Sequence, residues 1–183
     1  MVLVTAEDTP LDIVVTHTHA MSSYRNVGIV LWRGETTLLG VKQLRELMHR
    51  LTERHTVGIG LLQIVESSAP PPDAVARKAI ADLLASQREY LRCSALVFEE
   101  GGFKMAAVRA IVSGISALAR PGYPHIVFSG AADAASWIDG LLPKAAGRWA
   151  NARGILEEVE RLRSQLDEEC GSLRPQWRAL PAD

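Results

Sequence analysis

Apolar positions along the chain follow two different spacings, and their alternation predicts an α/β fold. Short runs rich in β-branched and aliphatic residues, which are typical of strands, cover residues 11–19, 24–33, 57–65, 94–98 and 124–128. Between these runs, apolar residues recur every three or four positions, as on one face of a helix, at residues 38–51, 73–91, 103–119 and 129–141. The predicted order is β-β-α-β-α-β-α-β-α over residues 11–142. Because such elements are joined by crossover connections, we expect a mixed, mostly parallel sheet covered by helices.

Turn and capping residues mark the ends of these elements. Residues 20–23 are predicted to turn between the first two strands, which favours an antiparallel hairpin. The helices are preceded by side chains that can accept a hydrogen bond from an exposed backbone N–H, namely Thr36 or Thr37, Asp73, and Ser129 or Asp133.

Residues 143–170 are a different kind of segment, set off by Pro143 and Gly147. They predict an amphipathic helix, too short to be a secure coiled coil on its own. Its apolar stripe has heptad spacing at Ile155, Val159, Leu162 and Leu166. Two uses fit this stripe: an arm that forms a homodimer or holds a partner, with these four as candidate oligomerisation residues, or a helix folded back onto its own domain. Residues 1–10 and 171–183 are predicted to be a flexible lead-in and a frayed tail.

Composition narrows the class of protein. Among 183 residues, 48% are hydrophobic, 22% charged and only 5% aromatic, so we expect a globular domain with a largely aliphatic core. A net charge of −1 gives no reason to expect affinity for nucleic acid. The N-terminus lacks the features of a signal peptide, and no run reaches the length of a membrane span. With two well-separated cysteines, Cys93 and Cys170, we expect reduced thiols in a cytoplasmic protein.

The most informative stretch is the end of the buried run at residues 57–65. It passes through a Glu-Ser-Ser turn and three prolines before the next helix begins. In open α/β sheets, functional sites gather where a strand gives way to a helix. The candidates here are Ser67 and Ser68 for phosphorylation, and Glu66, Pro70 and Asp73 for partner docking. The alternative is an ordinary polar turn before a loop stiffened by proline.

No other pattern predicts a reactive or metal-binding centre. His17 and His19 alternate on a predicted strand, but no further ligand accompanies them, so a solvent-facing edge strand is expected. The Gly101-Gly102 pair follows two acidic residues, which favours a tight turn over a phosphate site. No nucleophile motif such as Gly-x-Ser-x-Gly is present. We therefore predict no catalytic residue, no metal and no cofactor.

The element order and the Glu66-Ser67-Ser68 turn resemble the STAS family, which includes anti-sigma-factor antagonists and the cytoplasmic domains of sulfate transporters. In the antagonists, the matching turn carries an Asp-Ser pair whose serine is phosphorylated by a partner kinase. The resemblance implies that Ser67 corresponds to that serine and Glu66 to the aspartate. The chain departs from the family where an Ala-Pro-Pro-Pro run replaces the glycine-rich continuation.

These observations lead to two expectations for function. The first is a non-enzymatic protein-interaction module of bacterial signalling or scaffolding, homodimeric, with a kinase or regulatory protein as partner and a serine-phosphorylation switch. The second is an α/β domain that binds a small ligand or a lipid. In that case the apolar helix at residues 103–119 would line the pocket.

Overall fold

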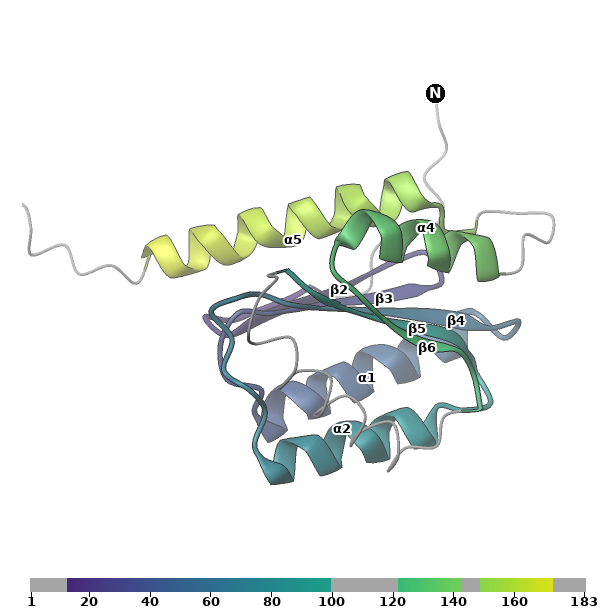
Figure 1. Cartoon of the computed structure of the whole chain (residues 1–183), viewed down its shortest axis with the longest axis horizontal. Coiled ribbons are helices and arrows are strands. Elements are labelled where there is room, and N and C mark those ends of the chain that lie inside the picture. The colour runs from purple at the N-terminus through teal and green to yellow at the C-terminus, as the bar shows by residue number, and fades with distance from the viewer. Residues whose placement is uncertain (1–12, 100–121, 143–148, 173–183) are drawn as a thin grey trace, which may run out of the picture.

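The computed structural model describes residues 13–99, 122–142 and 149–172, which form an α/β fold around one six-stranded sheet (Figure 1). The strands lie in the sheet in chain order, as β1 (Val14–Val15), β2 (His19–Tyr24), β3 (Val27–Trp32), β4 (Ile59–Val65), β5 (Leu91–Phe98) and β6 (His125–Phe128). The first three strands run antiparallel to one another in turn, whereas β3 to β6 are parallel. The predicted mixed, mostly parallel sheet is therefore confirmed.

Helices cover both faces of the sheet (Figure 1). On one face lie α1 (Leu38–Arg54) and α2 (Ala74–Ser86), and on the other lie α4 (Ala131–Leu141) and α5 (Ala152–Ser172). Each face has its own aliphatic core. The predicted caps of α1 and α2 are confirmed, because Thr37 Oγ1 accepts a hydrogen bond from the Gly40 N–H and Asp73 Oδ1 accepts one from the Ala76 N–H.

The first hairpin differs from its prediction. Residues 20–23, predicted as a turn, lie within β2, and the chain turns instead at Arg25 and Asn26. Arg25 has a φ of 53°, a conformation typical of two-residue hairpin turns. Ser22 can be buried in a strand because its hydroxyl donates a hydrogen bond to the carboxylate of Glu158 on α5. A partner 136 residues away cannot be seen from local sequence.

Smaller corrections concern the ends of other elements. The described part of the strand predicted at residues 11–19 is reduced to the two-residue β1. The helix predicted at residues 73–91 ends at Ser86, and Leu91 begins β5. The N-cap of α4 is Gly130, which provides no side-chain cap, rather than Ser129 or Asp133. The helix predicted at residues 103–119 lies outside the described residues, as do residues 1–10 and 173–183.

The C-terminal helix α5 folds back onto the sheet over β1, β2 and β3. Its stripe is fully buried in the core on that face, at Ile155, Val159, Leu162 and Leu166. The second of the two alternatives is therefore the one observed, and these four residues do not form an exposed oligomerisation surface. Among the described helices, none has the length and apolar composition needed to cross a membrane.

Candidate functional site at the carboxyl edge of the parallel strands

Three parallel strands end side by side and place three charged residues next to one another. Trp32 of β3 pairs with Val65 of β4, and Val65 pairs in turn with Phe98 of β5. The residues that follow directly are Arg33, Glu66 and Glu99. The strand register, which the sequence does not specify, therefore assembles a charged row at the edge where ligand sites of α/β sheets form.

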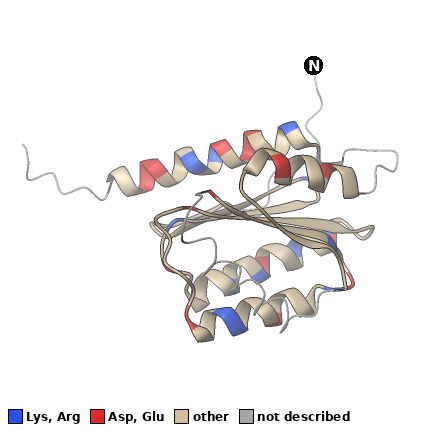
Figure 2. Ribbon diagram, viewed as in Figure 1, with Lys and Arg blue, Asp and Glu red and all other residues tan. Residues whose placement is uncertain are grey.

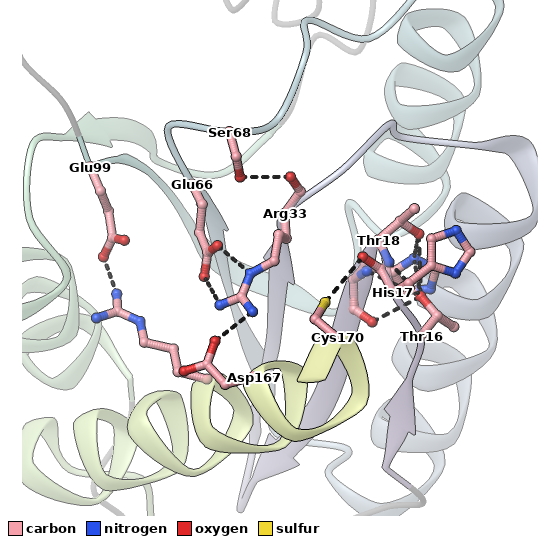
Figure 3. Close-up of polar contacts among 11 residues, drawn as sticks. Thr16, His17, Thr18, Arg33, Glu66, Ser68, Glu99, Asp167 and Cys170 are labelled. Atoms are coloured by element: carbon pink, nitrogen blue, oxygen red, sulfur yellow. Dashed lines mark hydrogen bonds and ion pairs between the residues drawn. The ribbon is translucent and has the colours of Figure 1, made fainter. Parts of the chain in front are cut away.

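Arg33 is the centre of this row (Figure 3). Its Nε lies 2.6 Å from Glu66 Oε2 and its Nη2 lies 3.1 Å from Glu66 Oε1, which is a two-pronged pairing. Its Nη1 also lies 2.6 Å from Oδ1 of Asp167 on α5. Hydrogen bonding to Glu66 raises the pKa of Arg33, against the opposing effect of partial burial, and Asp167 adds to the increase. Arg33 therefore stays charged and links α5 to the end of β4.

A second arginine joins α5 to the same edge. Arg163 forms ion pairs with Glu99, after β5, and with Glu160 one turn earlier on α5. We call the five residues Arg33, Glu66, Glu99, Arg163 and Asp167 the edge clamp. The clamp fixes the second half of α5 above the carboxyl ends of β3, β4 and β5 (Figure 3).

The Glu-Ser-Ser segment is a tight turn supported by the clamp. The Ala69 N–H donates a hydrogen bond to the Glu66 carbonyl at 3.0 Å, which closes a β-turn with Ser67 and Ser68 at its tip. The Ser68 hydroxyl donates to the Arg33 carbonyl at 2.8 Å (Figure 3). Ser67 is exposed, and its hydroxyl makes no hydrogen bond to any described residue. The Arg33 side chain therefore anchors Glu66 at the start of this turn, and the Arg33 carbonyl holds Ser68 at its tip, next to the exposed Ser67.

The predicted docking residues have different positions around this turn. Glu66 is half-buried and paired, so it anchors the turn. Asp73 is exposed, but its carboxylate caps α2. Pro70 is exposed. The three residues are thus brought to one edge of the sheet. The carboxylates of Glu66 and Asp73 are already engaged within the protein, by the ion pair and by the helix cap.

The prediction for the two histidines is wrong for His19. This residue begins β2 and is only 2% exposed. Its Nδ1 lies 2.9 Å from Thr18 Oγ1, its Nε2 lies 2.9 Å from Gln43 Oε1, and its ring packs against Trp32. Burial lowers the pKa of His19. A polar group this deep needs partners from a distant helix, which strand alternation alone does not reveal.

His17 lies in the bend before β2, near the end of α5 (Figure 3). Its carbonyl lies 3.8 Å from the Cys170 sulfur. Within the part of the chain that the structure describes, no three metal-ligating side chains come together.

Sequence reasoning missed four of the five clamp residues, namely Arg33, Glu99, Arg163 and Asp167. A usable signal exists for two of them. Arg33 and Glu99, like Glu66, directly follow a strand end. Comparing the first residue after each of β3, β4 and β5 would have identified a row of three charged residues, one basic and two acidic. The two α5 residues offer no such signal, because helices rich in Glu and Arg commonly form pairs within themselves.

Comparison of the chain with protein-family models, curated proteins and solved structures finds no match. The resemblance to the STAS family therefore remains a prediction from element order and from the central turn.

Proposed function

We propose that the chain is a non-enzymatic protein-interaction module that acts in signalling or scaffolding. The partner protein binds at the turn surface, which we define as Ser67, Ser68, Pro70 and Val75. The observation that carries the proposal is the exposed Ser67 at the tip of a turn in which Arg33 bonds both neighbours of Ser67, Glu66 and Ser68.

The turn surface is pre-organised for binding. Its backbone is closed by the turn hydrogen bond, its base is held by the Arg33–Glu66 pair, and its far end is fixed by the capped start of α2. Because the turn is already ordered, binding of a partner costs little conformational entropy in this loop. Val75, in the first turn of the helix that follows this loop, is 57% exposed and offers an apolar contact to a partner.

Ser67 is the better of the two candidate modification sites. Its hydroxyl is exposed and uncommitted among the described residues, whereas the Ser68 hydroxyl is used to hold the Arg33 carbonyl. A phosphate on Ser67 would add about −1.5 to −2 charges to the turn surface. Because the four residues of the turn surface are themselves uncharged, a phosphate on Ser67 would change the charge of this surface and its affinity for a partner.

The proposal is tested with a photo-crosslinking residue at position 67 and a matched control at Ser136, an exposed residue on α4 on the other face of the sheet. We expect a protein from the native lysate to crosslink from position 67 and not from position 136. That protein, once purified, should bind the wild-type chain directly in a titration.

Variants then locate the contact. Ser67→Glu and Val75→Asp are each expected to weaken binding of the purified partner by about tenfold or more. Both side chains are exposed, so the fold should be retained, which circular dichroism checks. Equal crosslinking from the two positions, or unchanged affinity in both variants, would show that the turn surface is not the docking site.

A further inference from the structure

The net charge of −1 hides a separation of charge between the two faces of the sheet (Figure 2). Helices α1 and α2 together carry six basic and three acidic residues, a net charge of +3. Helices α4 and α5 carry three basic and eight acidic residues, a net charge of −5. The two helical layers therefore carry net charges of opposite sign on opposite faces of the sheet, although each layer contains both basic and acidic residues (Figure 2).

The basic side also carries exposed apolar side chains. Leu38 and Leu39, at the start of α1, are 56% and 63% exposed. Lys42 and Arg45 continue the stripe of Leu38 at helical spacing, and neither forms an ion pair with a described residue. We call these four residues the α1 patch. Large apolar side chains flanked by uncompensated charges are typical of a contact surface.

On the acidic side, a shallow hollow lies on α5, lined among the described residues by Arg153, Leu156, Glu157 and Glu160. We call it the α5 hollow. Among the described residues, Glu157 pairs only with the highly exposed Arg153, at 2.8 Å, and an ion pair in contact with solvent is weak. This carboxylate can therefore exchange its partner for a cation on another molecule at little cost.

We infer that this chain associates with further copies of itself, with the α1 patch of one copy seated in the α5 hollow of the next. Leu38 and Leu39 fill the hollow, and Lys42 and Arg45 face Glu157 and Glu160. The two surfaces differ and lie on opposite faces of the sheet. The contact is thus heterologous, and copies add front to back into an open chain.

This inference concerns other residues than the turn surface and does not depend on it. It also replaces the dimerisation arm predicted from the heptad stripe, because that stripe is buried in its own domain.

The first test is sedimentation velocity on the full chain across a range of protein concentrations, at low and at high salt. We expect species larger than a dimer to grow with concentration at low salt, and to diminish at high salt as the charges are screened. Leu38→Ser combined with Leu39→Ser should weaken association by about tenfold or more. Leu141→Ser, at a 43% exposed residue of α4 outside both surfaces, should leave association unchanged.

A mixing experiment tests the front-to-back arrangement itself. One variant has a blocked α1 patch, Leu39→Ser with Lys42→Glu, and the other has a blocked α5 hollow, Glu157→Lys with Glu160→Lys. All four side chains are exposed, so both variants should fold. Each is expected to be monomeric alone, and the mixture should give a dimer with one copy of each and nothing larger.

Three results would overturn the inference: a wild-type chain that stays monomeric at every concentration, undiminished association in the double-leucine variant, or a mixture of the blocked variants that stays monomeric. Because the partner-binding test uses Ser67 and Val75, its result can fail or succeed independently of these measurements.

Discussion

The α1 and α5 helices both lie across the sheet, but they are attached to it in different ways. The α1 helix is held mainly by apolar side chains, among them Leu44, Met48 and Leu51. The α5 helix adds to its apolar stripe a set of polar links, including the Ser22–Glu158 hydrogen bond and the edge clamp. Apolar burial has no direction, whereas each of these polar links joins one named residue of α5 to one residue in or next to a strand.

This difference explains why one helix was easier to interpret than the other. An apolar stripe shows that a helix buries one side, but it does not show against what. For α1, short connections to β3 and β4 leave the sheet as the only surface against which the stripe can pack. For α5, the same kind of stripe was compatible with packing against a second copy of the chain and with packing against its own domain. The links that decide the matter come from β2, β3 and the end of β5.

The largest expected effect tests whether α5 is as much part of the core as α1. Leu162→Ala should lower the free energy of unfolding by about 2–5 kcal/mol, as Leu44→Ala should in α1, because both side chains are fully buried. Urea unfolding measures both. Leu141→Ala, at an exposed position, should stay within about 0.5 kcal/mol of wild type. A Leu162→Ala effect as small as that of Leu141→Ala would mean that α5 is detachable.

The next effect concerns the buried polar link beneath α5. Glu158→Ala removes the acceptor of the Ser22 hydroxyl and the partner of Arg161, so it should destabilise the fold by about 1.5–3 kcal/mol. The change at the exposed neighbour Glu160→Ala is the control, expected within about 0.5 kcal/mol. A double-mutant cycle between Ser22→Ala and Glu158→Ala should show coupling, and additive effects would contradict the link.

A smaller effect is expected from the edge clamp. Arg33→Gln leaves Glu66 and Asp167 without their shared cation and should destabilise the fold by about 1–2 kcal/mol, since the pair is only partly buried. Hydrogen exchange should accelerate in the last turns of α5 and in residues 66–69, and stay unchanged in α1. Lys78→Ala, which breaks an exposed pair with Asp82, should alter neither rate. Uniform acceleration across the chain would show that the clamp has no local role.

The smallest effect is the dependence of stability on pH. Burial lowers the folded-state pKa values of His19 and His125 below the ordinary value of 6.5. The unfolded chain therefore binds protons that the folded chain does not, so this part of the stability is complete above pH 6.5 and is lost as the pH falls below it. Urea unfolding at pH 7.5 and at pH 5.5 measures the loss. His19→Gln should reduce it, and an unchanged loss would assign it to other groups.

The sequence allowed the fold class to be predicted because the apolar spacing in each element is regular, as in α1 and β4. The first hairpin was misplaced because Ser22 and Ser23 are typical of turns, and only the distant Glu158 makes Ser22 acceptable in a buried strand. The candidate turn was predicted at the correct edge of the sheet, but the residues that support the turn were not predicted. Arg33 lies 33 residues before Glu66, and only the register of β3 against β4 brings them together.

The position of α5 as the last described helix has a consequence for synthesis on the ribosome. The hairpin of β2 and β3 is made early, but the helix that covers one of its faces is made late, with Ser22 and Glu158 separated by 136 positions. At roughly 5–20 residues per second, about 7 to 27 s pass between the synthesis of Ser22 and that of Glu158. During this interval the aliphatic side chains that α5 covers in the folded protein lack that cover, which leaves them open to non-native contacts.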